Sequence, residues 1–363
     1  MRGPAAAAIA PHRLFFSLAL AQGALSILLW TFASPPPDGP FWHAHEMVFG
    51  YGLAVVAGFL LTKTGSAGLL ALAAAWAAAR LAALVPNAPA LLRDALAFTS
   101  TAAIAGTAAQ TFLRGAKRGG NLVFPALMLF LPVGEGAFLA GEAGLWPGGE
   151  RAGAWFGLGL IVMLIAAMGG RIAGAAVSGA SQRRGGPRLA PDGRRERLTL
   201  AALAGGFAAT GLDAPALFAA GLLVVGGVLL LLRVTARGPG LRPSPADVRA
   251  VVAGQVWLGL GCLATGLASL LPLPLPPAAA FHLATIGGIG GTTLVMMLRT
   301  VAQRERAHVP PAVFAAVAAL VGAAALLRAL GFPAPGGAYA AAALVWTAAF
   351  GIVALAVFCL RSR

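Results

Sequence analysis

The sequence predicts an all-α protein: a polytopic bundle of about 12 transmembrane helices that forms a single integral membrane domain over residues 1–363. Three observations predict this class. Only 10% of the residues are charged, whereas soluble domains average about 25%. Hydrophobic residues make up 59% of the chain and the mean hydropathy is +0.85, which is more apolar surface than one soluble core can hide. The apolar runs are continuous and about 20 residues long, so a soluble enzyme, a disordered or fibrous protein and an outer-membrane barrel are all excluded.

Twelve apolar stretches are long enough, or nearly so, to cross a bilayer. A helix needs about 20 residues to span about 30 Å of hydrocarbon, because each residue adds about 1.5 Å. In chain order the predicted spans are 14–33, 42–62, 66–85, 90–113, 121–140, 153–178, 198–212, 215–236, 248–271, 278–299, 310–330 and 337–360. The seventh is the weakest because it is short and rich in glycine, so it could be a short tilted span or half of a hairpin.

Proline-rich and charged segments separate these spans. Residues 35–40 end the first helix, and four prolines between 272 and 277 separate the ninth and tenth spans, since proline removes a donor and fixes the backbone. The segment 181–197 contains six arginines together with glycine and proline, which predicts a solvated loop. The first apolar run is long for a cleaved signal peptide, the alternative interpretation, and therefore favours a retained helix.

The distribution of positive charge predicts the orientation. With the twelve spans above, 21 of the 26 Lys and Arg residues lie on one side, and Arg171 lies within a span. The four cations on the other side are Arg80, Arg93, Arg151 and Arg328. Because cytoplasmic loops carry the excess of Lys and Arg, both termini are expected in the cytoplasm. The net charge of +15 is thus interpreted as a topology signal, and no nucleic-acid partner is expected.

Three of the five histidines fall at one predicted depth, in the outer third of the bundle. His43 and His45 begin the second span, and His282 opens the tenth. Ionisable residues inside spans are costly and mark functional sites. A haem held by imidazoles from different helices suits a bundle interior, and copper also accepts imidazole. The alternative is that these are interfacial histidines bonded to loop carbonyls, but three at one depth beside Glu46 favour a metal.

Helical spacing distinguishes the three histidines. Residues two apart are separated by about 200° around a helix, so His43 and His45 should face different partners. We predict that His43 and His282 approach each other across a helix interface and that one of them is an axial haem ligand. His45, beside the carboxylate of Glu46, is assigned a second role, in hydrogen bonding or copper binding.

Further charges near the predicted outer side support a buried site. Arg80 and Arg93 flank the loop between the third and fourth spans and could pair with haem propionates, because guanidinium matches carboxylate geometry. The alternative is that they extend to outer lipid headgroups. Glu135 could pair with one of them. Arg171 follows two glycines in the sixth span and is expected to support the site from further away or to extend toward the cytoplasmic surface.

Four motifs resemble those of the NnrS family. The stretch WHAHEMVFGYGLAVVAGFLLT at 42–62 is similar to its second helix, and HLATIGGIGGTTLVMMLRT at 282–300 to its His-led glycine helix. HRLFFSLAL at 12–20 and AMGGRIAGAAVSG at 167–179 resemble two further family motifs. The resemblance implies a twelve-span bacterial inner-membrane protein that carries haem and copper and is linked to nitric oxide and nitrosative stress, often near denitrification genes. The positions that match the motifs are His43, His45, Glu46, Arg171, His282 and Arg299.

Outside these four motifs, two departures from the family pattern are visible. The family often has a histidine after the glycine helix, where this chain has Arg304, and His308 stands four residues later. If that histidine were a ligand, a metal site on the cytoplasmic side would be lost. Lys63-Thr64-Gly65 replaces a Pro-Asn-Trp after the second span.

Three functions compete. The leading hypothesis is a haem protein that binds, senses or helps to detoxify nitric oxide, rather than an enzyme. The alternative is a secondary transporter with a proton- or metal-ion-coupled polar site, which internal repeats would favour, but the motif at 42–47 has no counterpart at the eighth span. An oxidase or nitric oxide reductase is disfavoured because no Cys-x-x-Cys-His or flavin motif provides an entry for electrons.

Overall fold

The computed structural model describes residues 9–33, 40–85, 87–114, 122–186, 188, 192–236, 241, 244–332 and 335–360. Every regular element in these ranges is helical. Contacts between residues divide the chain into two compact units, Met1–Ser26 with Pro36–Gly157 and Ile27–Pro35 with Leu158–Arg363. The prediction of one domain over the whole chain stays a prediction.

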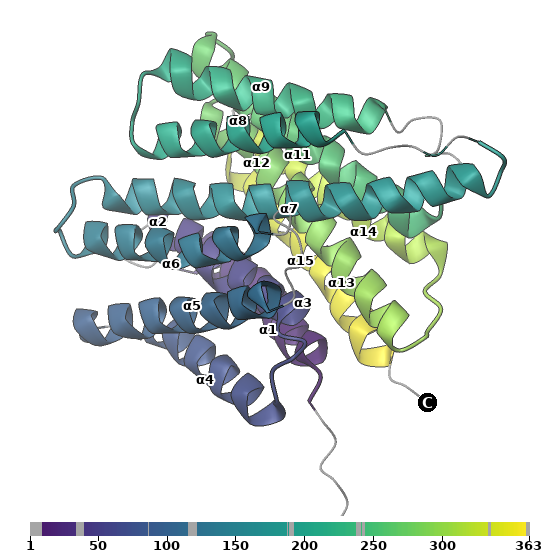
Figure 1. Cartoon of the computed structure of the whole chain (residues 1–363). Coiled ribbons are helices and arrows are strands. Elements are labelled where there is room, and N and C mark those ends of the chain that lie inside the picture. The colour runs from purple at the N-terminus through teal and green to yellow at the C-terminus, as the bar shows by residue number, and fades with distance from the viewer. Residues whose placement is uncertain are drawn as a thin grey trace, which may run out of the picture. The chain divides into compact units, whose positions relative to one another are not determined.

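The first unit is built from several whole helices and from parts of two others. Its elements are α1 (Pro11–Phe32, as far as Ser26), α2 (Pro40–His45), the π-helix η1 (Glu46–Gly52), α3 (Leu53–Leu60), α4 (Ser66–Ala82), α5 (Ala90–Leu113), α6 (Val123–Glu142) and α7 (Gly149–Gln182, as far as Gly157). Helix α5 packs between α4 and α6 (Figure 1). Glycines let α6 approach α7 closely, since a Cβ on Gly153 would lie 2.4 Å from the backbone nitrogen of Phe138.

The second unit is arranged around one long helix. Its further elements are α8 (Gly193–Gly211), α9 (Ala216–Thr235), α11 (Ala246–Leu270), α12 (Pro277–His282), the π-helix η3 (Leu283–Gly290), α13 (Gly291–Arg304), α14 (Pro311–Leu330) and α15 (Pro335–Cys359). Helix α11 contacts α9, α12, η3, α13 and α14. Small residues bring it close to its neighbours, because a Cβ on Gly261 would lie 2.1 Å from the backbone nitrogen of Ala284.

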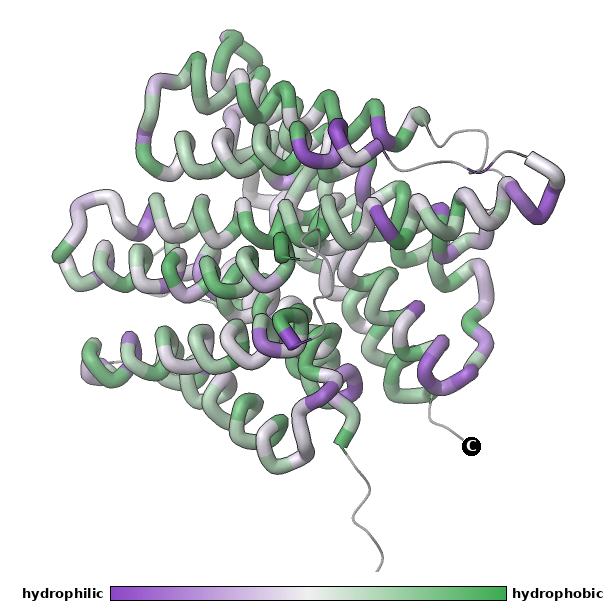
Figure 2. The backbone as a smooth tube through the Cα atoms, viewed as in Figure 1, coloured by the Kyte–Doolittle hydropathy of each residue, from purple (hydrophilic) through white to green (hydrophobic). Residues whose placement is uncertain are grey.

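Eight helices are long and apolar enough to cross a membrane. They are Pro11–Phe32, Val123–Glu142, Gly149–Gln182, Ala216–Thr235, Ala246–Leu270, Pro277–Arg304, Pro311–Leu330 and Gly336–Cys359. Figure 2 shows hydrophobic residues along most helices and hydrophilic residues gathered at turns, for example after α7. Large apolar side chains such as Leu91, Leu217 and Leu355 point outward, as lipid-facing residues do. The chain is therefore an all-helical membrane protein.

All twelve predicted spans coincide with a helix or with consecutive helical segments, although four do not reach the length or apolarity of a span. The stretch 42–62 is broken into α2, η1 and α3, and α4 has 17 residues. α5 and α8 carry charged residues in their first turns. Twelve crossings and cytoplasmic termini thus stay predictions. Some of the breaks and charges used for them lie outside the described residues, namely 35–39, Arg2, Lys117, Arg118, Arg237, Arg242, Arg361 and Arg363.

Helix α8 begins before the predicted seventh span. Asp192 precedes it, and its carboxylate accepts a hydrogen bond of 3.0 Å from the backbone N–H of Arg195. This bond holds the pKa of the exposed Asp192 carboxyl below its usual range and satisfies one of the free donors of the first turn. The charged turn 193–197, expected to be loop, is therefore helical, and α8 pairs with α9 as a hairpin.

Candidate functional site

A cluster of polar side chains is buried inside the first unit. His45, Glu46, Arg80 and Glu135 come from α2, η1, α4 and α6, and at most 7% of each residue is exposed. Ionisable groups are rarely buried unless they are paired, so four of them in an apolar unit identify this cluster as the candidate site.

His45 lies between two carboxylates. Its Nε2 is 2.9 Å from Oε1 of Glu135, and its Nδ1 is 3.2 Å from Oε1 of Glu46. The ring is also packed against Phe49 and Phe138, with centroid distances of 5.4 and 4.7 Å. Because a carboxylate only accepts hydrogen bonds, both ring nitrogens carry protons when both carboxylates are ionised. The ring is fixed by these contacts and by aromatic packing.

Glu46 is the centre of the hydrogen-bond network. Its Oε1 accepts a hydrogen bond of 2.7 Å from the guanidinium of Arg80, and its Oε2 accepts one of 2.6 Å from the amide of Gln22. Gln22 also donates to Ser26 on the same helix. The carboxylate is thus compensated by Arg80, by the amide of Gln22 and by the neighbouring ring of His45, which is the condition for burying a charge.

A glycine in η1 makes this arrangement possible. A Cβ on Gly50 would lie 3.0 Å from the amide nitrogen of Gln22 and 3.3 Å from Cδ of Arg80. The carbonyl of the same glycine accepts a hydrogen bond of 3.0 Å from the indole of Trp76. Gly50 therefore lets two polar side chains approach the backbone, and Trp76 fixes the π-helix against α4.

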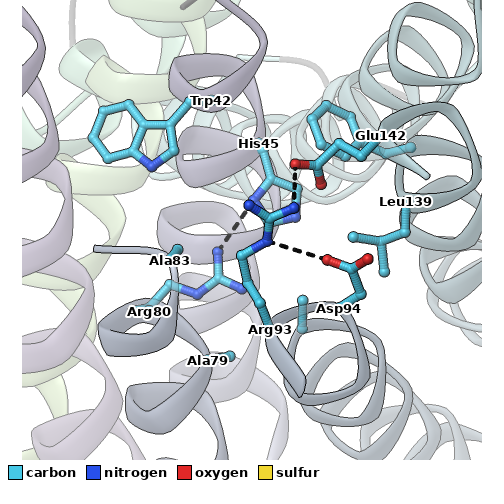
Figure 3. A pocket seen from close by; sticks show the side chains of 11 residues that line it. Trp42, His45, Ala79, Arg80, Ala83, Arg93, Asp94, Leu139 and Glu142 are labelled. Atoms are coloured by element: carbon cyan, nitrogen blue, oxygen red, sulfur yellow. Dashed lines mark hydrogen bonds and ion pairs between the residues drawn. The ribbon is translucent and has the colours of Figure 1, made fainter. Parts of the chain in front are cut away.

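A pocket opens beside the cluster (Figure 3). Its inner wall includes Trp42, His45 and Arg80, and charged residues of α5 and α6 line it as well. The guanidinium of Arg93 contacts Glu142 at 2.9 Å and Asp94 at 3.2 Å, and its side chain is 30% exposed. Arg80 and Arg93, which the sequence suggested as partners of haem propionates, thus line one pocket. Glu135, expected beside an arginine, contacts His45 instead.

The other predicted residues lie outside this cluster. His43 is half-buried in the last turn of α2. Arg171 pairs at 3.3 Å with Glu196, with its side chain 43% exposed, and Arg299 pairs with Asp247. Both arginines have their own carboxylate partners in the second unit. Arg304 is exposed in the last turn of α13, and His308 after it is exposed as well.

His282 ends α12 in the second unit and directly precedes η3. Its Nδ1 lies 2.7 Å from the carbonyl oxygen of Ala278. A carbonyl accepts only, so Nδ1 carries the proton, and Nε2 carries the lone pair of the neutral ring. The predicted approach of His282 to His43 stays a prediction.

The histidines differ in how well they suit a metal or haem iron. Metal-bound imidazoles use one nitrogen for the metal and donate from the other to an oxygen. In His282, Nδ1 makes such a contact with the carbonyl of Ala278. His45 has both nitrogens against carboxylates, so it does not fit as a ligand in this arrangement. Among the described residues, no three His, Cys, Asp or Glu side chains converge on a metal position.

The sequence did not point to all members of the site. Gln22 and Trp76 were not recognised, although Gln22 is a polar residue in an otherwise apolar run. The two π-helices were also not anticipated. Each follows a histidine and contains glycines, at positions 50 and 52 and at 287, 288 and 290, and π-helices often occur at functional sites.

Comparison with known proteins places this architecture in a family. No curated protein matches the chain. A family model described as NnrS protein matches residues 7–363, which is nearly the whole length and includes both histidine-led helices. The chain therefore belongs to the NnrS family, and this membership supports a membrane protein related to the nitric oxide response.

Proposed function

We propose that this protein is a haem-containing protein of the bacterial inner membrane that binds nitric oxide and takes part in the response to nitrosative stress. Family membership and the buried polar site support the proposal. The observation that carries it is the hydrogen bond of 2.7 Å from Nδ1 of His282 to the carbonyl of Ala278, which fixes the ring and its tautomer.

The proposed ligands follow from these contacts. His282 is the proposed axial ligand through Nε2, and His43 is the second candidate for haem or copper. His45 positions the neighbouring groups, because Glu46 and Glu135 hold both of its nitrogens. Arg80 and Arg93 are the proposed partners of the haem propionates. A bound haem would supply an iron to which nitric oxide can bind, and copper is the proposed second metal.

The experiment is an absorption spectrum of the full-length protein purified after haem-replete expression. A Soret band is expected, with a shift on addition of nitric oxide. His282→Ala should abolish or shift the band because it removes an axial ligand, whereas His308→Ala is the matched control and should keep it. A wild-type protein without a Soret band would refute the proposal.

A second candidate is a secondary transporter coupled to protons or metal ions. The observation that favours it is the buried cluster of His45, Glu46, Arg80 and Glu135, because ionisable residues inside membranes often mark ion pathways. Proteoliposomes containing a pH-sensitive dye distinguish the two. A copper or zinc gradient should drive proton movement for a transporter and should leave the pH unchanged for a haem protein without transport.

A further inference from the structure

Three hydrogen-bond donors in the pocket of the first unit have no acceptor among the described residues. They are Nε and Nη2 of Arg80 and the indole Nε1 of Trp42. Both residues line the pocket, and only 4% of Arg80 and 6% of Trp42 is exposed. Figure 3 shows both side chains at this pocket, with Ala83 between their chains. The donors therefore belong to two residues, one on α2 and one on α4, that line the same pocket.

Such donors are costly unless something accepts from them. An unsatisfied buried donor costs about 1–3 kcal/mol, more for a charged group, and native proteins contain few. Arg80 uses only Nη1, which donates to Glu46 at 2.7 Å. The remaining Nε–Nη2 edge is a planar fork that matches two oxygens of one ligand group.

The surroundings limit the ligand further. The buried groups Arg80, Glu46, Glu135 and His45 sum to zero charge when His45 carries two protons. Among the other residues that line the pocket, Arg93 faces two carboxylates, Asp94 and Glu142, so the charged groups of these three sum to an excess of one negative charge. A dianion such as sulfate would be repelled by this excess more strongly than a monoanion.

We propose that Arg80 and Trp42 form a binding site for a planar oxyanion with a single negative charge, of the carboxylate or nitrite type. Two oxygens accept from the Nε–Nη2 edge of Arg80, and one of them also accepts from the indole N–H of Trp42. The apolar walls, including Ala79, Ala97 and Leu139, exclude water from the bound group and strengthen these bonds.

The oxyanion can come from two sources. One is a propionate of the haem, in which case the inference deepens the proposed function and rests on it. The other is a free anion, such as nitrite, in which case the site exists whether or not haem binds. The shared chemistry is the same planar pair of oxygens.

The test uses full-length protein purified with and without haem supply during expression. Thermal unfolding is followed while nitrite or formate is added, with sulfate at equal ionic strength as the control anion. Binding to the folded state should raise the midpoint with nitrite and formate and leave it unchanged with sulfate. Arg80→Lys, which keeps the charge but loses the fork, should weaken the apparent affinity about tenfold or more.

Trp42→Phe keeps the ring and removes only the N–H, so it tests the site even if Arg80→Lys does not fold. We expect about tenfold weaker binding. Arg328→Lys and Trp146→Phe are the matched controls, because Arg328 stacks on Tyr339, Trp146 is exposed in the turn after α6, and neither residue lines the pocket. Both controls should bind nitrite as wild type does.

The outcomes separate the two sources. A midpoint shift only without haem supports a propionate as the resident oxyanion, and a shift in both preparations supports a free-anion site. A midpoint shift in a protein that shows no Soret band even after haem-replete expression would refute the haem proposal but support the oxyanion site. The inference would be overturned if nitrite and formate did not shift the midpoint of the haem-free protein. It would also be overturned if Arg80→Lys and Trp42→Phe showed the same shift as the wild type.

Discussion

The ion pair of Glu46 and Arg80 gives the most quantitative prediction. The perturbation is a double-mutant cycle with Glu46→Gln, which keeps the shape, and Arg80→Met, which keeps the stem. At 2.7 Å and an effective dielectric constant of about 20, the Coulomb attraction is about 6 kcal/mol before desolvation, which is an upper bound. Breaking a buried pair at one partner typically costs about 3–5 kcal/mol.

Each single variant should therefore lower the free energy of unfolding by about 3–5 kcal/mol, because it leaves one buried charge without its partner. The double variant should be more stable than the sum of the two losses predicts, by about 2 kcal/mol or more. The assay is reversible unfolding in mixed detergent micelles, followed by tryptophan fluorescence.

The control cycle uses Arg171 and Glu196, which lie 3.3 Å apart with side chains 43% and 21% exposed. Solvent screening should reduce their coupling below about 1 kcal/mol. Additive losses for Glu46 and Arg80, within about 0.5 kcal/mol, would show that the two groups do not interact and would refute the buried network.

Two further predictions follow from the packing and the charge distribution. Gly261→Ala should destabilise the protein because its Cβ would lie 2.1 Å from the backbone nitrogen of Ala284. The Cβ of Gly351→Ala meets nothing within 4 Å, so this variant should add about 0.5–1 kcal/mol of helix stability. Thermal melts of the two variants test the difference. In a Cys359→Ser background, a cysteine at Arg184 should react with an impermeant thiol reagent only from the cytoplasm and one at Leu145 only from outside, and the reverse pattern would overturn the charge-based orientation.

The positions of the helices could be predicted because each apolar run of about 20 residues has the length of a span. The helix α9, at Ala216–Thr235, deviates from its predicted span by one residue at each end. The start of α8 was wrong by five residues, because a cap by Asp192 makes a charged turn helical, and hydropathy does not register caps. The π-helices could not be predicted, since their register depends on tertiary contacts such as Trp257 against Gly287.

The site could be predicted only in part. Glu46 and Arg80 were both expected near the outer side and they do meet, although Arg80 was expected to pair with a haem propionate or to extend to lipid headgroups. Gln22 was missed because a single amide in an apolar run has no spacing to interpret. Glu135 was expected to pair with Arg80 or Arg93 but contacts His45, since nothing in the sequence tells which polar group of a neighbouring helix a carboxylate reaches.

The two histidine-led helices share a backbone pattern, although few of their side chains are the same. In each, a six-residue α-helix begins at a proline and ends at a histidine, His45 or His282, and a π-helix follows at once. A glycine stands five residues after each histidine, at Gly50 and Gly287. The counterpart of the second span is thus the tenth and not the eighth, and few side chains recur between them.

The same backbone position does not give the same chemistry. Glu46 follows His45, whereas the apolar Leu283 follows His282, so only the first ring has a carboxylate from the next residue. His282 donates from Nδ1 to a carbonyl instead, the contact that metal-bound imidazoles commonly make with their other nitrogen. We therefore expect His282→Ala to remove or shift the Soret band, and His45→Ala to keep the band but change the response to nitric oxide. Loss of the band in His45→Ala with an unchanged spectrum in His282→Ala would reverse the two roles, and absorption spectra of both variants from haem-replete cells decide between them.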